Sequence, residues 1–152
     1  MSQDIYFETI GQDGPAVFWG HGWGQSSQAF VPLAQSLSSK GQHYVVDFPG
    51  FGQSAVPDDP WGSEEYADAL AAFIKSKTDE KIVWIGHSFG CRVGLQLAAR
   101  HPELIEGLCL IAAAGLPRKR PLWHKLYYGA RVHVFKFLKK LIPLGLSQEW
   151  LY

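Results

Sequence analysis

The chain has 152 residues, of which 47% are hydrophobic and 18% are charged, so it is long enough to bury one ordinary globular core. Fourteen basic residues balance fourteen acidic ones, and this zero net charge favours neither a nucleic-acid partner nor a membrane surface. No apolar stretch is long enough to span a membrane, and the N-terminus lacks the basic and apolar regions of a signal peptide. We therefore expect a cytoplasmic protein.

Short apolar runs alternate with segments of helical periodicity through the first three quarters of the chain. The runs predict strands at residues 5–10, 16–19, 44–46, 81–85 and 108–111. The periodic segments predict helices at residues 30–37, 63–74 and 91–100. Ser63 is expected to cap the second helix, whose first turn holds Glu64 and Glu65, where the helix dipole favours acids. This alternation indicates an α/β fold with a mostly parallel sheet and helices on both faces.

Two cysteines, Cys91 and Cys109, lie within apolar stretches, so we expect both to be buried, reduced and structural. No group of histidine, cysteine, aspartate or glutamate residues in the sequence has the spacing of a metal site. The chemistry suggested below also needs no bound group. We therefore expect neither a metal nor a cofactor.

A G-x-S-x-G pattern lies between the fourth predicted strand and the helix that follows it. It consists of Gly86, His87, Ser88, Phe89 and Gly90. A sharp turn from strand to helix strains its central residue, and only small residues two positions away on each side avoid a clash. Such a turn would present the Ser88 hydroxyl at the carboxyl ends of the strands, beside a helix N-terminus. The pattern predicts that Ser88 is a catalytic nucleophile; the alternative is a tight turn with an incidental serine.

A glycine-rich loop with the sequence His-Gly-Trp-Gly begins at His21, directly after the second predicted strand. Acyl transfer needs two donors that face the developing oxyanion, and glycines let backbone N–H groups approach closely. We expect these donors to be the N–H groups of Trp23 and Phe89. His21 and Gly22 in this loop, and His87 beside the serine, are expected to support the loops rather than to react. The alternative is a glycine turn with a structural histidine.

Four motifs occur in an order that is typical of one family: residues 21–24, 47–54, 86–90 and 100–103. With them, residues 4–116 resemble the N-terminal part of the α/β-hydrolase fold family, in its group of small esterases, lipases and carbon–carbon hydrolases. The resemblance implies a serine hydrolase. Its expected substrate is a small apolar molecule with a carboxylic ester or related acyl bond, cleaved through an acyl-serine intermediate.

The resemblance also implies the order of the catalytic triad: serine, then an acidic residue, then histidine. The last two are expected on loops after two further strands, and the sequence after Ala113 contains neither such strands nor a matching histidine loop. We therefore expect a core truncated before its last strands, with impaired activity. Asp47 ends a strand on the active side and is the best remaining acid. His124 and His133 are more simply explained as helix-surface residues than as the triad base.

Residues 117–152 hold eight basic residues and one acidic residue, whereas residues 1–116 hold six basic and thirteen acidic ones. Apolar residues recur in the C-terminal segment at helical spacing. In the family a helical cap is inserted at this place, so we interpret 1–116 as part of the hydrolase core and 117–152 as the start of a cap or lid. The alternatives are an ordinary helix with a solvated charged face and a basic helix on an anionic membrane surface.

Two other functions are compatible with the same residues: a non-catalytic protein that binds a small apolar molecule, and an acyltransferase on the same scaffold. A dinucleotide-binding protein is disfavoured because no helix opens in register after the glycine-rich loop. No nucleic-acid partner is expected. A core that ends at the strand near residues 108–111 would expose a sheet edge, which predicts self-association through that edge.

Overall fold

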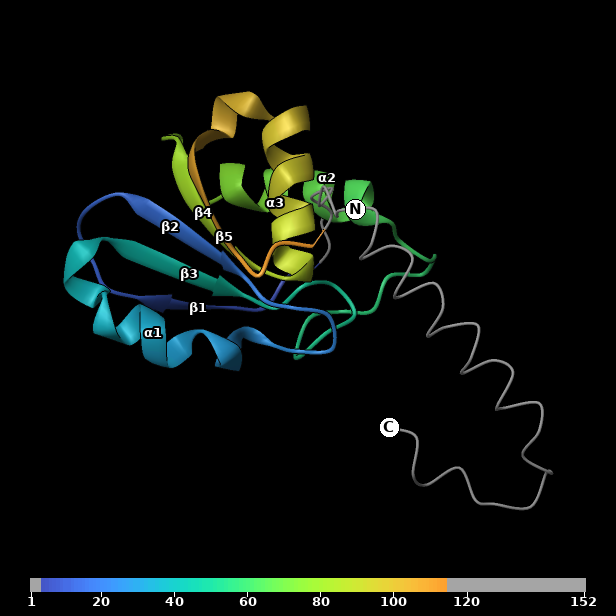
Figure 1. Ribbon diagram of the computed structural model, residues 1–152, viewed down its shortest axis with the longest axis horizontal. Coiled ribbons are helices and arrows are strands. Elements are labelled where there is room, and N and C mark those ends of the chain that lie inside the picture. Colours follow the sequence, from blue (N-terminus) through green and yellow to red (C-terminus); the bar gives the residue numbers. More distant parts are fainter. Residues whose placement is uncertain (1–3, 115–152) are drawn as a thin grey trace, which may run out of the picture. The chain divides into compact units, whose positions relative to one another are not determined.

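The computed structural model describes residues 4–114, which form a five-stranded sheet (Figure 1). The strands are β1 (Phe7–Ile10), β2 (Ala16–Gly20), β3 (Gln42–Val46), β4 (Ile82–His87) and β5 (Ile105–Ile111). Their order across the sheet is β1-β3-β2-β4-β5. β1 runs antiparallel to β3, and the other pairs are parallel. The prediction of a mostly parallel sheet is confirmed, and all five predicted strands are present.

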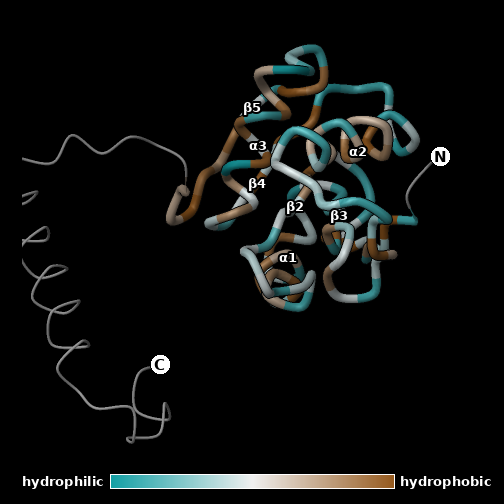
Figure 2. The backbone as a smooth tube through the Cα atoms, turned by 90° about the vertical axis from the view of Figure 1, so that its right-hand side faces the viewer, coloured by the Kyte–Doolittle hydropathy of each residue, from teal (hydrophilic) through white to brown (hydrophobic). Residues whose placement is uncertain are grey.

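Helices cover both faces of this sheet, as predicted. The helices are α1 (Val31–Ser36), α2 (Ser63–Lys75) and α3 (Phe89–Arg100). α1 packs on one face, and α2 and α3 pack on the other (Figures 1 and 2). Three short 3₁₀ turns, Ser27–Ala29, Ser38–Lys40 and Pro102–Leu104, lie in the connections.

The larger core lies between the sheet and helices α2 and α3, and Trp84 of β4 is at its centre. The Trp84 indole is fully buried, and its Nε1–H donates to the Gly90 carbonyl oxygen at 3.0 Å. α3 lies directly on the ring, because a Cβ added at Gly94 would be 2.4 Å from it. Truncating a buried tryptophan costs about 3–5 kcal/mol. This packing fixes α3 against β4 and so fixes the Ser88 turn that joins them.

The smaller core lies under α1, where Trp19 of β2 packs on Phe30 with ring centroids 5.1 Å apart. The Trp19 Nε1–H donates to Nδ1 of His43 at 3.1 Å. The other ring nitrogen of His43 is therefore the protonated one, and it donates to the Leu37 carbonyl oxygen at 2.9 Å. Both nitrogens of this buried histidine are occupied by structural hydrogen bonds.

The cap of α2 differs from the prediction by one residue. Gly62 is the N-cap and Ser63 is already in the first helical turn. The Glu65 side chain explains the shift, since its carboxylate accepts the Gly62 N–H at 2.8 Å. This is the glutamate half of a capping box, which needs no side chain at the cap residue.

The prediction that both cysteines are buried is wrong for one of them. Cys91 is buried, but Cys109 on β5 is exposed. Its neighbours in the sheet share the exposure: Ile111 is 39% exposed, and Ile85 on β4, which pairs with Cys109, is only partly buried. The smaller core under α1 reaches Val83 and Ile85 of β4 but includes no residue of β5, although β5 is largely hydrophobic (Figure 2). Self-association through the β5 edge stays a prediction.

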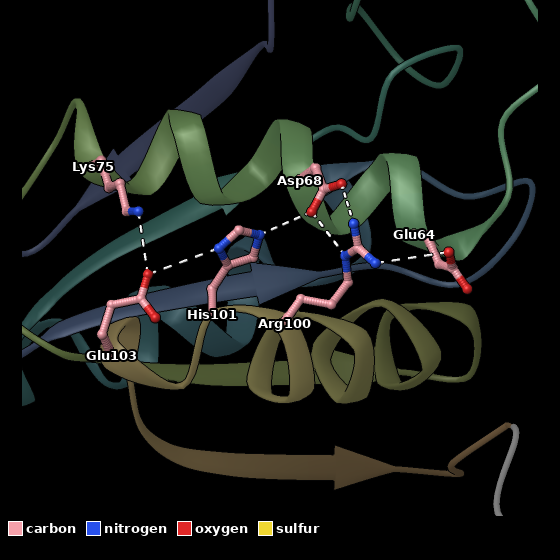
Figure 3. Close-up of polar contacts among 6 residues, drawn as sticks. All are labelled: Glu64, Asp68, Lys75, Arg100, His101 and Glu103. Atoms are coloured by element: carbon pink, nitrogen blue, oxygen red, sulfur yellow. Dashed lines mark hydrogen bonds and ion pairs between the residues drawn. The ribbon is translucent and has the colours of Figure 1, made fainter.

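A surface cluster of charged residues links α2 to the end of α3 (Figure 3). Its members are Glu64, Asp68, Lys75, Arg100, His101 and Glu103. Arg100 donates hydrogen bonds of 2.9 and 2.6 Å to the Asp68 carboxylate, and His101 Nε2 lies 2.9 Å from it. These donors lower the pKa of Asp68 to about 2. Because the cluster is solvent-exposed, its ion pairs add little to the stability of the fold.

The basic segment at residues 117–152, with its predicted cap, lies outside the described residues. Within residues 4–114, no helix combines the length and the apolar character that crossing a membrane requires.

Candidate active site

Ser88 lies on the turn between β4 and α3, at the carboxyl end of the sheet and at the N-cap of the helix. Its backbone has φ +49° and ψ −100°, a strained conformation for a residue with a side chain. Three main-chain hydrogen bonds hold the residue there. Its N–H donates to the Ile111 carbonyl oxygen at 3.0 Å, and its carbonyl oxygen accepts the N–H groups of Cys91 at 3.2 Å and Ala114 at 3.3 Å. The end of β5 therefore fixes the position of the serine.

Gly86 and Gly90 flank the serine because the chain passes too close for any side chain. A Cβ at Gly86 would lie 2.5 Å from the Gly90 carbonyl group. A Cβ at Gly90 would lie 2.0 Å from the Gly20 carbonyl oxygen and 2.9 Å from that of His21. The absence of a side chain lets the Gly90 N–H donate to the His21 carbonyl oxygen at 3.1 Å. This hydrogen bond joins the serine turn to the glycine-rich loop.

The glycine-rich loop forms a tight turn that begins at Gly22 and ends at Gln25. The Gln25 N–H donates to the Gly22 carbonyl oxygen at 3.2 Å, and Gly24 within the turn has φ +73°, which glycine adopts without strain. Within residues 4–114, the N–H of Trp23 at the tip of this turn donates no hydrogen bond. The same holds for the N–H of Phe89, which is in the first turn of α3 and has no partner within the helix.

His21 is buried behind this loop, and both of its ring nitrogens are occupied. Nδ1–H donates to the Gly22 carbonyl oxygen at 2.8 Å, and Nε2 accepts the Phe48 N–H at 3.0 Å. Burial lowers the pKa of His21, because the charged ring would lose its hydration. The ring is therefore neutral at pH 7, and it joins the loop after β2 to the loop after β3.

Asp47 is buried at the end of β3, and its two carboxylate oxygens are both engaged. Oδ1 accepts the N–H of Ser27, and Oδ2 accepts the N–H of Gln53 at 2.8 Å. Gly52 approaches it so closely that a Cβ there would lie 2.0 Å from Oδ2. The carboxylate thus joins three chain segments. Among the described residues, no histidine is hydrogen-bonded to it.

Four of the six histidines lie in the described part of the chain, and none is hydrogen-bonded to the Ser88 hydroxyl. His21 and His43 are occupied as described. His87 is adjacent to the serine in sequence, but its Nδ1 lies 3.2 Å from Oε1 of Gln25. His101 is at the far end of α3, about 18 Å along the helix. His124 and His133 lie outside the described residues.

Aromatic rings surround the serine turn. The Trp23 side chain is 66% exposed and contacts Phe51 and Phe89 edge to face, with centroids 5.0 and 5.1 Å apart. Phe89 also contacts Tyr66, at 5.3 Å. An exposed tryptophan held between two other rings gives the surface beside Ser88 an apolar wall.

The structure brings the predicted site residues together at one end of the sheet: Ser88, Phe89, His21, Gly22, Trp23, Gly86, His87 and Gly90. Sequence analysis missed Gln25, whose side chain contacts both motifs. It also missed the end of β5, which holds the serine N–H. The predicted strand end at residue 111 could have indicated the contact of β5 with the serine. Nothing in the sequence indicated the contacts of Gln25.

The serine lies at a strained strand-to-helix turn of a mostly parallel sheet, and a glycine-rich loop faces it. These features are typical of α/β proteins whose site lies at the carboxyl ends of the strands. A model of the alpha/beta hydrolase fold family matches residues 15–142. The chain belongs to this family.

Among curated proteins, the pimeloyl-[acyl-carrier protein] methyl ester esterase of Shewanella woodyi is 39% identical over 114 residues. The match covers 75% of this chain and 41% of that protein, so the chain spans less than half the length of this relative. A solved esterase from Thermogutta terrifontis is 28% identical with a TM-score of 0.70, over 76% of this chain and 42% of that one. A bacterial membrane phospholipase A is 27% identical with a TM-score of 0.73, over 85% and 44%.

Proposed function

We propose that this chain carries the nucleophile and the oxyanion donors of a serine hydrolase that cleaves carboxylic esters through an acyl-serine intermediate. The observation that carries the proposal is the backbone of Ser88, which is strained at φ +49° and held at the carboxyl end of the sheet at a helix N-terminus. Strain of this kind persists where the surrounding structure maintains it, and it is concentrated at functional sites. The comparison with esterases of the same family supports the same chemistry.

In the proposed reaction, Ser88 Oγ attacks the carbonyl carbon of the ester and its proton passes to a general base. The electron pair of the carbonyl double bond moves to the oxygen, which accepts hydrogen bonds from the N–H groups of Trp23 and Phe89. When the carbonyl re-forms, the alkoxide leaves with the proton from the base, and the acyl group stays on Ser88. Water then repeats the attack, which releases the acid and restores the serine.

The proposal takes its base and acid from outside residues 4–114, because none of the four histidines described there is hydrogen-bonded to Ser88. The family order of serine, acid and histidine supports this assignment. A serine without a base is a weak nucleophile, although an oxyanion hole and substrate binding alone accelerate hydrolysis by roughly 10³ over water. We therefore propose that a chain without such a base turns over slowly.

For the substrate, we propose a small molecule with an apolar acyl or alcohol group next to the ester. The ring of Trp23 and its neighbours Phe51 and Phe89 would contact that group. The related protein of Shewanella woodyi is an esterase for the methyl ester of pimeloyl-[acyl-carrier protein]. A short aliphatic ester is accordingly the first substrate to test.

The test is labelling with a fluorophosphonate, which forms a covalent bond with activated serines, followed by mass spectrometry of the labelled peptide. We expect slow labelling of Ser88, because no base lies beside it in the described residues, and we expect Ser88→Ala to abolish the label. Ser39→Ala, at an exposed serine of a 3₁₀ turn, is the matched control and should label like the wild type. A folded wild-type protein that stays unlabelled, or a label that survives in Ser88→Ala, would overturn the proposal.

A further inference from the structure

The side chain of Gln25 closes the glycine-rich turn a second time. Besides the main-chain bond from its N–H to the Gly22 carbonyl oxygen, its Oε1 accepts the Gly22 N–H at 2.9 Å. Gly22 is buried, so water does not readily replace this acceptor. The fit is close, because a Cβ at Gly22 would lie 2.7 Å from Gln25 Oε1. Both polar main-chain groups of Gly22 are therefore occupied by Gln25.

This double closure leaves the Gly22 N–H unavailable to an oxyanion and fixes the start of the loop. Gly22 and Gly24 flank Trp23, and glycines leave the backbone many conformations at little energetic cost. Hydrogen bonds, rather than side-chain sterics, must then hold the Gly22–Trp23 peptide in place. With the Gly22 N–H bound to Gln25, the N–H groups of Trp23 and Gly24 are left without a partner in the described residues, and that of Trp23 is the proposed oxyanion donor.

The same oxygen connects the loop to the residue before the serine. His87 Nδ1 lies 3.2 Å from Gln25 Oε1. The Gly22 N–H identifies the amide atom at this point as the oxygen, which only accepts hydrogen bonds. The neighbouring His87 Nδ1 must therefore carry the proton and donate it, and Nε2 is the unprotonated nitrogen of the neutral ring. Gln25 thus joins the glycine-rich loop to the end of β4 through a histidine of defined tautomer.

We propose that Gln25 is a positioning residue: it holds the Trp23 N–H in place for the oxyanion and keeps His87 as the Nδ1–H tautomer. The first half of this inference rests on the proposed function, because the oxyanion forms only if Ser88 reacts. The second half concerns hydrogen bonds that exist whether or not the serine reacts. The two halves therefore have separate measurements.

The variants are chosen to keep volume while changing the acceptor. Gln25→Met has nearly the same length and cannot accept the two hydrogen bonds. Gln25→Glu keeps an acceptor oxygen and serves as the rescue. Gln28→Met is the matched control, because Gln28 is an exposed glutamine three residues further on that bonds only to Glu8 on the surface. None of these substitutions removes a reacting atom.

The tautomer is read at pH 8 from the ¹⁵N shifts of the histidine rings by NMR, with His87→Gln to assign the signal. In the wild type we expect the proton on Nδ1, and in Gln25→Met we expect it on Nε2, the tautomer that free histidine prefers. The Gly22 amide should exchange with solvent at least tenfold faster in Gln25→Met. Gln25→Glu should restore both properties, and Gln28→Met should leave both unchanged.

The rate of fluorophosphonate labelling measures the oxyanion half. Removing an oxyanion donor outright costs about 10²–10³ in rate, so loosening one should slow labelling of Gln25→Met at least tenfold. A wild-type rate in Gln25→Met, or an Nε2–H tautomer of His87 in the wild type, overturns the role of Gln25 and leaves the proposed function standing. A folded wild type that does not label at all overturns the proposed function and the positioning role together.

Discussion

Replacing Asp47 by asparagine separates a structural carboxylate from a catalytic one. Asp47 is 1% exposed, and its two oxygens accept N–H groups from Ser27 and Gln53. Asparagine has one acceptor oxygen, so one of the two N–H groups must face an NH₂ group instead. Ser27 is also 1% exposed, whereas Gln53 is exposed to solvent. The side chain will therefore keep its oxygen toward Ser27, and water will serve Gln53.

The cost follows from this orientation. Asp47→Asn loses one hydrogen bond to a charged acceptor, about 1.5–3 kcal/mol of the free energy of unfolding. Asp47→Ala loses both hydrogen bonds and leaves the buried Ser27 N–H without an acceptor, which adds about 1–3 kcal/mol. The free energy of unfolding of Asp47→Ala should therefore be lower than that of Asp47→Asn by at least about 1 kcal/mol. The whole free energy of unfolding of a domain of this size is only about 5–15 kcal/mol.

Urea unfolding followed by tryptophan fluorescence measures these differences, with Asp58→Asn in an exposed loop as the matched control. Asp58→Asn should unfold within about 0.5 kcal/mol of the wild type. If Asp47→Asn unfolds like Asp58→Asn while Ser88 labelling falls, Asp47 acts in the chemistry and the structural assignment is refuted. If alanine is tolerated better than asparagine, the hydrogen-bond argument is refuted.

Two further predictions concern packing and pH. Gly90→Ala should destabilise the fold by about 1–3 kcal/mol or more and abolish Ser88 labelling, because its Cβ would meet the Gly20 carbonyl oxygen. Gly107→Ala is the control, because a Cβ at Gly107 meets nothing within 4 Å. It should be nearly neutral in the same unfolding assay. Because burial lowers the pKa of His21, the unfolded chain binds a proton near pH 6.5 that the folded chain does not. The stabilisation is present above pH 6.5 and is lost as pH falls through the lower folded-state pKa. The free energy of unfolding should fall by at most about 1.4 kcal/mol per pH unit. If a His21→Gln variant loses stability equally steeply, the pH dependence does not come from His21.

Local geometry explains which parts of the site could be predicted from the sequence. Gly86 signals the serine turn because the turn itself brings the Gly90 carbonyl group within 2.5 Å of any Cβ added there, so the chemistry and the spacing are linked in one short segment. The mostly parallel sheet follows from the alternation of strands and helices for the same reason. These features depend on residues that are neighbours in the chain.

Features that depend on distant partners could not be predicted. Gln25 is an exposed glutamine in a loop, and only the fold shows that it faces Gly22 and His87. Cys109 lies in an apolar strand, but the pattern of a strand does not show which of its faces is covered. The start of α2 differs by one residue for a local reason, because Glu65 accepts the N–H of Gly62 and so competes with the better cap residue, Ser63.

The contacts around Ser88 also explain why labelling and turnover should respond differently to mutation. The serine is positioned by the end of β5 through Ile111, and the loop opposite is tied to the same turn by the hydrogen bond from Gly90 to His21. All of these partners lie within residues 4–114, and none of them is a general base. Covalent labelling needs one attack by Ser88 and the loss of its proton, whereas repeated turnover needs a proton transfer in every step of each cycle. Substitutions at the supporting contacts should therefore reduce labelling, and a change that supplies a base should raise both labelling and turnover and leave the backbone of Ser88 as it is.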